Sequence, residues 1–313
     1  GMISMGSAFS GTGLTSVEIP DSVTNLGGTF IGCANLTSVV IPTSVTNLDF
    51  TFRNCTSLVS VKIPDGVTSL ERTFEGCTNL ANVEIPDGVT KLEGTFKDCT
   101  SLANVEIPES VISLERAFEG CKGLKTITIP ASVTNLDCAF IDCTGLTDVV
   151  ISEGVTSIGN QAFENDTALI NVTIPNSVTS IGESAFNFCV SIKNIAIPES
   201  VTPIGQKAFM YCRQLESVTI PSKISKLEDD VFSYCNALKE VQLPDTLTEI
   251  GENAFTETGI EYIFLPDSVS AIADSAFSGS TQQKMTISIH ENDYVWAWAK
   301  ERGITVTKAP LGY

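Results

Sequence analysis

The sequence predicts a repeat solenoid: a right-handed coil of about twelve 22–23-residue repeats stacked into one long parallel β-sheet, closed by a small α/β cap. Three observations predict it: a leading Leu or Ile recurs at near-constant spacing, a short strand pattern ending in proline follows it, and single Phe and Cys positions recur in register. The leading residues are Leu14, Leu36, Leu58, Leu80, Leu102, Leu124, Leu146, Leu169, Ile192, Leu215, Leu238 and Ile260.

The spacing of these leading residues also predicts the domain organisation. It is 22 residues as far as Leu146, 23 from there to Leu238, and 22 in the last step. We assign residues 1–280 to the solenoid, with 22-residue repeats to about residue 157 and mainly 23-residue repeats after it. Residues 281–313 lose the period and read as strand, short helix and strand, which predicts a terminal cap.

Each repeat begins with a strand pattern. Val39 and Ile41 are two residues apart and therefore point to one face of a strand. Pro42 ends that strand, because proline has no N–H to donate to a β-ladder. The later repeats add an Ile-Gly-x-x-Ala-Phe pattern, in which glycine suits a backbone turn with positive φ. This expectation covers Gly159, Gly182, Gly205 and Gly251.

A phenylalanine position forms the spine of the predicted core. Thirteen of the sixteen Phe residues share one register, and Phe74 and Phe96 stand for this structural ladder. One repeat cannot bury such a ring by itself, whereas stacked repeats can. The register consists of Phe9, Phe30, Phe52, Phe74, Phe96, Phe118, Phe140, Phe163, Phe186, Phe209, Phe232, Phe255 and Phe277.

A cysteine position follows the phenylalanine, and nine of the ten cysteines share it, including Cys77 and Cys99. Stacked repeats hold their Cβ atoms parallel, which does not suit disulfides, and no C-x₂-C pair suits zinc. Catalysis by a thiol needs a histidine partner, and His290 is the only one. We therefore expect buried packing thiols, no metal site, and Cys138, which lies off the register, as the most accessible thiol.

The pattern L-x-x-V-x-I-P-x-x-V-T-x-I-G-x-x-A-F-x-x-C from Leu169 to Cys189 resembles the BspA-like leucine-rich repeat family. The resemblance covers about residues 8 to 280. It implies a leucine-rich-repeat solenoid in a bacterial surface or secreted protein involved in adhesion and host interaction, usually as part of a longer chain. It carries no catalytic residues. The resemblance thus predicts an extracellular or cell-surface location, although no signal peptide is visible.

Composition excludes several kinds of partner. The formal net charge is −19, with 18 Lys and Arg among 37 Asp and Glu, which argues against nucleic acid and against anionic membrane surfaces. No apolar run reaches the roughly 18 residues that span a bilayer, so we expect no membrane insertion of this chain. We expect a monomer.

Acidic residues recur once per repeat at Asp49, Glu71, Glu93, Glu115 and Asp137. A calcium-binding row is conceivable, but no calcium-loop motif is present, and a solvated row is the simpler interpretation. A neighbouring row alternates in sign, which predicts ion pairs between repeats. That row consists of Arg53, Glu75, Lys97 and Glu119.

Aromatic residues gather late in the chain and mark the candidate binding site. The position before the ladder cysteine is Gly, Asn or Asp in the early repeats and becomes Phe188, Tyr211 and Tyr234 in three successive repeats. The outward strand positions are mostly small and polar until Tyr262 and Phe264. Exposed aromatics are enriched at interfaces. The alternative is that the three rings stack on one another merely to seal an edge.

No nucleotide-binding, zinc-protease or nucleophile-elbow motif is present, so the sequence predicts no enzyme and no cofactor. We expect a module that binds a host or matrix protein or a glycan through its sheet face and aromatic C-terminal third. The alternative is a structural spacer of a larger surface protein, with no ligand of its own.

The net charge generates a first prediction. Raising the NaCl concentration from about 10 to about 150 mM shortens the screening length from roughly 30 to roughly 8 Å, so repulsion among the excess carboxylates weakens. The melting temperature should therefore rise, as measured by circular dichroism. A melting temperature that falls over this range would contradict the prediction.

Overall fold

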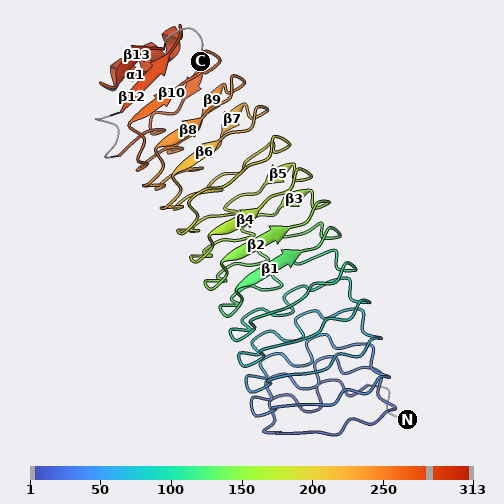
Figure 1. The fold of residues 1–313 in the computed structure, drawn as a ribbon. Coiled ribbons are helices and arrows are strands. Elements are labelled where there is room, and N and C mark those ends of the chain that lie inside the picture. Colours follow the sequence, from blue (N-terminus) through green and yellow to red (C-terminus); the bar gives the residue numbers. More distant parts are fainter. Residues whose placement is uncertain (1–3, 280–284, 310–313) are drawn as a thin grey trace. The chain divides into compact units, whose positions relative to one another are not determined.

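The computed structural model of the protein describes residues 4–279 and 285–309. Its internal contacts divide the chain into two compact parts. The N-terminal part extends to Val155 and includes Asp166–Leu169, and the C-terminal part comprises Thr156–Asn165 and the chain from Ile170 onward. Each part consists of stacked repeats (Figure 1). The predicted boundary between solenoid and cap, residues 280 and 281, involves residues outside those described.

Parallel strands form between neighbouring repeats of the N-terminal part. Strand β1 (Thr126–Ile129) pairs with β2 (Asp148–Ile151), so that each residue faces the residue 22 positions later. Exposed and buried residues alternate along β1, as the spacing of its isoleucines predicts. The parallel solenoid predicted from the repeat period is confirmed.

Each repeat of the C-terminal part contributes to two rows of short parallel strands rather than one. The first row follows the strand pattern at the start of the repeat, and the second lies at its Val-Thr-x-Ile stretch, which the sequence analysis did not assign to a strand. In the first row β6 (Ser217–Thr219) pairs with β8 (Glu240–Gln242), and β4 (Asn171–Thr173) precedes them. In the second row β3 (Ser157–Ile158) pairs with β5 (Ser180–Ile181), and β7 (Lys226–Leu227), β9 (Glu249–Ile250) and β11 (Ala271–Ile272) pair in that order.

The first row is interrupted in the early repeats of the N-terminal part. Among the described residues of repeats 80–108, a single isolated bridge, Asn82↔Asn104, joins the expected strands. Asn and Glu are poor strand formers, and Glu84 and Glu106 place like charges at the same position of neighbouring repeats. Apart from Asp148, strands β1 and β2 instead consist of Thr, Val and Ile, which favour the ladder there.

Two left-handed residues per repeat turn the chain back toward the core. Ser184 and Phe188 have φ values of 55° and 60°, and Lys207 and Tyr211 repeat them at 58° and 60°. The expectation that the repeated glycines adopt positive φ is wrong for Gly182, Gly205 and Gly251, because the left-handed residue lies two positions further on. These glycines allow close approach instead.

The close approach is visible at Gly205. A Cβ atom there would lie 2.6 Å from the backbone nitrogen of Glu183 in the preceding repeat. At such a distance any side chain would collide with the main chain. Glycine is therefore required by the contact between repeats and not by the turn.

In each part of the chain the turn places one phenylalanine per repeat in a column of stacked rings. The Phe74 and Phe96 ring centroids are 5.7 Å apart at an interplanar angle of 5°, and Phe96 and Phe118 are 5.4 Å apart. All three rings are fully buried. The column thus runs through the core of each part, with the strand residues packed beside it.

The ladder cysteines lie beside this column as free, fully buried thiols. Each thiol donates to the carbonyl oxygen of the phenylalanine one repeat earlier, as Cys77 Sγ does to Phe52 O at 3.0 Å and Cys99 Sγ to Phe74 O at 3.1 Å. Burial raises the pKa of the thiol in seven of them, to about 12 for Cys55; the seven are Cys55, Cys77, Cys99, Cys121, Cys143, Cys212 and Cys235. They are therefore neutral at physiological pH and pack as small, weakly donating side chains.

A cap of strands and one helix closes the C-terminal end (Figure 1). Strands β10 (Tyr262–Phe264), β12 (Thr286–Ile289) and β13 (Thr305–Lys308) form a parallel sheet, and α1 (Asp293–Glu301) contacts β13. The predicted strand, helix and strand are thus present. Within the described ranges no helix has the length and apolar character needed to cross a bilayer.

Two side chains fasten the cap to the last repeat. Asn292 caps the helix, because its Oδ1 accepts from Val295 N at 2.9 Å, while its Nδ2 donates to Val269 O at 2.8 Å. Trp298 packs edge-on against Phe277 with ring centroids 5.9 Å apart. A tryptophan therefore terminates the phenylalanine column.

Phe96→Ala should destabilise the protein by about 3–5 kcal/mol, because the neighbouring rings cannot collapse into the cavity that it leaves. The measurement is a urea denaturation curve. Val40→Ala, at a position 82% exposed, is the control and should change stability by less than about 0.5 kcal/mol. If Phe96→Ala lowered the free energy of unfolding by less than about 1 kcal/mol, the phenylalanine column would not be a main source of the stability of the core.

Stability should fall as the pH rises from about 9 toward 12. An unfolded thiol ionises near its ordinary pKa of 9.0, whereas folded Cys55 stays protonated to about 12, so the unfolded chain binds fewer protons in between. Cys55→Ser keeps a donor to Phe30 O but does not titrate here, so its urea midpoint should fall less steeply between pH 7 and 10.5. Equal slopes would exclude the thiol as a source of the pH dependence.

Candidate functional site

Two surfaces stand out, one in each part of the chain. The first is a groove across the strand positions of three consecutive repeats in the N-terminal part. It encloses about 850 Å³ and is lined by residues between Ser60 and Glu109. The second is the row of three aromatic side chains at left-handed positions in the C-terminal part. The residues of the second were predicted as a candidate site from the sequence, whereas the first was predicted only as part of the sheet face.

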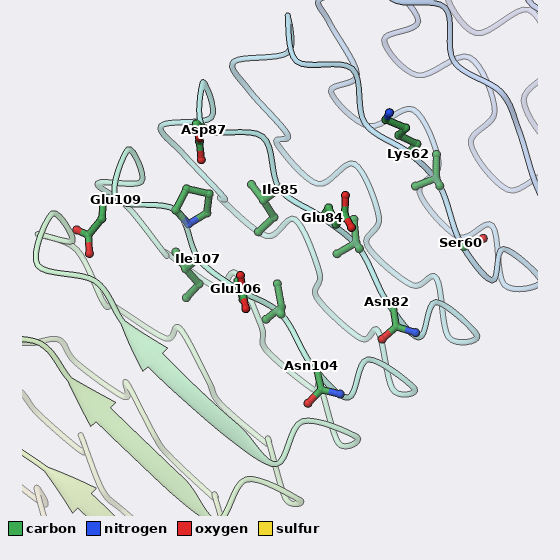
Figure 2. Close-up of a pocket in the computed structure, with 14 residues that line it drawn as sticks. Ser60, Lys62, Asn82, Glu84, Ile85, Asp87, Asn104, Glu106, Ile107 and Glu109 are labelled. Carbon is green, nitrogen blue, oxygen red and sulfur yellow. The ribbon is translucent and has the colours of Figure 1, made fainter.

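The polar residues of the groove are arranged in order along the repeats. Figure 2 shows Asn82 and Asn104 toward one end, Asp87 and Glu109 toward the other, and Glu84 and Glu106 between them. All six are exposed. The groove therefore presents pairs of like residues, each pair supplied by the same position of neighbouring repeats.

The floor of the groove is apolar and partly open. Val105 and Ile107 are half-buried, whereas their equivalents Ile127 and Ile129 in β1 are 4% and 0% exposed. The opening lies at this repeat, since the equivalent residues Val83 and Ile85 of the preceding repeat are buried. The outward Glu and Asn residues at successive strand positions were the sequence signal for this groove.

The aromatic row of the C-terminal part is a stack. The centroids of Phe188 and Tyr211 are 4.2 Å apart, and those of Tyr211 and Tyr234 are 4.6 Å apart, with interplanar angles of 16° and 13°. Phe188 and Tyr234 are 37% and 36% exposed, and Tyr211 between them is half-buried. We call these three residues the aromatic stack. The rings thus contact one another and also reach solvent.

The aromatic stack occupies backbone positions that disfavour large side chains. Phe188, Tyr211 and Tyr234 have φ values of 60°, 60° and 61°. Bulky residues are rare in this region because Cβ crowds the backbone, at roughly 1–2 kcal/mol each. One other repeat has a large residue at the same position, Glu257, and the remaining repeats use smaller or more tolerant ones: Asn54, Gly76, Asp98, Gly120, Asp142 and Asn165.

A cation lies over the middle of the stack. The guanidinium carbon of Arg213 is 5.6 Å from the centroid of the Tyr211 ring, within the range of a cation–π contact. Arg213 is exposed, so it adds a positive group to an otherwise apolar surface.

The other two predicted binding residues lie apart from the stack. Tyr262, in β10, is 56% exposed, while Phe264 is half-buried and meets His290 edge-on at 4.9 Å. In the part of the chain that the structure describes, no ring contact joins either residue to the aromatic stack. The five predicted residues therefore lie at two kinds of position: three at left-handed turns and two in β10.

The charged rows belong to the turns. Asp49 Oδ1 accepts from Ser69 Oγ at 2.8 Å and from the Glu71 backbone nitrogen at 3.1 Å, which links one repeat to the next. The ion pairs predicted between repeats are present, as Arg53–Glu75 at 2.9 Å and Lys97–Glu119 at 2.8 Å. Residues 4–279 and 285–309 contain no group of three or more His, Cys, Asp or Glu residues arranged to hold a metal ion.

Among solved structures the chain is similar to a leucine-rich repeat protein from Bacteroides ovatus, at 21% identity, with 95% of this chain and 92% of that chain covered and a TM-score of 0.48. A leucine-rich repeat protein from T. pallidum is 26% identical over 57% of this chain and 77% of its own, with a TM-score of 0.46. The pneumococcal vaccine antigen PcpA is 15% identical over 95% of this chain and 88% of its own, with a TM-score of 0.49.

A search of curated proteins found no match. The profile of the BspA type leucine rich repeat region matches the sequence in six copies, over residues 5–94, 71–179 and 157–284. These ranges cover well over half of the chain and contain the strand, phenylalanine and cysteine positions described above. The chain therefore belongs to the BspA-type leucine-rich repeat family.

Proposed function

We propose that the protein is a non-enzymatic interaction module of the bacterial surface that binds a host or matrix protein through the aromatic stack. Phe188, Tyr211 and Tyr234, exposed at strained backbone positions, carry this proposal. The surface location rests on what the family resemblance implies. Tyr211 and Tyr234 lie in the C-terminal third of the chain, where the candidate site was predicted from the sequence, and Phe188 lies shortly before it.

The energetics of the aromatic stack favour a partner over a purely structural role. Three large residues at left-handed positions cost roughly 1–2 kcal/mol each, and each of the two ring pairs returns roughly 0.5–1.5 kcal/mol. Stacking alone therefore leaves little or no net stabilisation compared with the glycine and asparagine of other repeats. Burial of the exposed ring surface by a partner would add a favourable contribution that is absent from the free protein.

The geometry of the stack favours a protein over a glycan. Sugars bind aromatic residues by lying flat on a ring face, but both faces of Tyr211 and one face each of Phe188 and Tyr234 are occupied by a neighbouring ring. Apart from the outer faces of the two end rings, the ring edges and the tyrosine hydroxyl groups are left for a ligand. Edges and hydroxyls along a ridge suit the mixed apolar and polar surface of a protein.

The test is binding of the purified chain to arrays of extracellular-matrix proteins and of glycans. Tyr211→Asn/Tyr234→Asn removes two rings and inserts a residue that this column already holds at Asn165. A protein ligand should bind this variant at least about tenfold more weakly, because central tyrosines dominate interface energies. Trp296→Ala, which removes an exposed aromatic from α1, is the matched control and should bind normally.

The outcomes separate the alternatives. Loss of binding in the double variant alone, with its melting curve unchanged, supports the aromatic stack as the site. Equal binding by both variants and the parent would contradict the proposal that the aromatic stack is the binding site. Binding to glycans only would show that the ligand is a glycan and not a protein. An absence of binding on both arrays would favour the alternative that the chain is a structural spacer.

A further inference from the structure

We propose that the groove of the N-terminal part is a second binding site, which takes a basic, extended segment of another protein. The groove consists of the strand positions of the repeats between Ser60 and Glu109 (Figure 2). It shares no residue with the aromatic stack. The inference therefore stands whether or not the stack binds a partner.

The charge of the groove determines the chemistry of its ligand. Four carboxylates line it, from Glu84, Asp87, Glu106 and Glu109, against the single cation of Lys62. The ion pairs of the described residues include none of these four, although Glu75 and Glu119 of the same repeats both pair with a cation. The groove thus holds four carboxylates and one cation, and none of the four carboxylates takes part in an ion pair of the described residues.

The floor and the open backbone favour a polypeptide over a small cation. Val105 and Ile107 are half-buried and offer apolar surface to the aliphatic stems of Lys or Arg. Within the described residues, no backbone hydrogen bond joins Glu84 and Ile85 to Glu106 and Ile107. An extended chain brings donors and acceptors that match such unpaired main-chain groups.

The dimensions also suit an extended segment. The polar groups of the groove are spread along residues 82–87 and 104–109, with amides at one end and carboxylates in the middle and at the other end. Six extended residues span about 17 Å at 3.3 Å per residue. A second copy of the chain is a poor occupant, because it carries the same net charge of −19. Nucleic acid is excluded by the same charge.

The experiment measures fluorescence anisotropy of a labelled nonapeptide of alternating Lys and Val, with alternating Glu and Val as the acidic probe. Glu84→Gln/Glu106→Gln removes two charges without changing side-chain shape. Glu153→Gln/Glu183→Gln removes the same charge at exposed positions outside the groove and is the matched control. Urea midpoints of all proteins verify that they are folded.

The basic peptide should bind the parent, and the groove variant should bind it roughly tenfold more weakly, as two lost charge pairs imply. The control should change affinity less than about twofold, and Glu84→Lys/Glu106→Lys should abolish binding. If the groove variant and the control bound the peptide equally weakly, the effect would be due to overall charge, and the proposal of a site in the groove would be wrong.

Two further outcomes would also overturn the proposal. One is binding of the acidic peptide as tightly as the basic one. The other is displacement of the bound peptide by spermine at equal concentration, which would show that any small polycation suffices. Failure of the peptide to bind, alongside a matrix-protein hit at the aromatic stack, would reject this site and leave the proposed function intact.

Discussion

A phenylalanine in the middle of the array can be buried only by the rings of the repeats before and after it. Phe96 lies 5.7 Å from Phe74 and 5.4 Å from Phe118, and all three are fully buried. This stacking requires that every repeat return its ring to the same place. The repeat length, the two left-handed residues of the turn, the close-approach glycines and the thiol donating to the preceding phenylalanine carbonyl all serve that requirement.

Because the inward positions are fixed by this constraint, departures from the pattern carry information. Asp166 occupies the cysteine register and is fully buried, with no hydrogen-bond partner for either carboxyl oxygen. Burial raises its pKa well above the ordinary value for a carboxyl group, which favours the neutral form of the side chain. The column therefore tolerates a polar group of similar size when that group carries no charge.

The features that depend on the repeat period could be predicted from the sequence. The register of Phe74 and Phe96, the ion pairs Arg53–Glu75 and Lys97–Glu119 and the cap helix all follow from spacing and local signals. The sequence did not suffice where two repeats interact through details of the backbone. A glycine that serves a positive φ and a glycine that serves a close approach look identical in sequence, and Gly205 is the second kind.

The candidate sites show the same division. The aromatic stack was recognisable because Phe188, Tyr211 and Tyr234 interrupt a column of small residues, but only the structure shows that their faces are occupied by one another. The sheet face was predicted as a binding surface, but the groove within it was not, because its shape depends on how neighbouring repeats pack and not on one repeat. In a solenoid the inward positions maintain the fold while outward positions vary one repeat at a time. Binding surfaces therefore arise as rows of similar side chains at the repeat spacing, and such rows favour partners that are themselves extended.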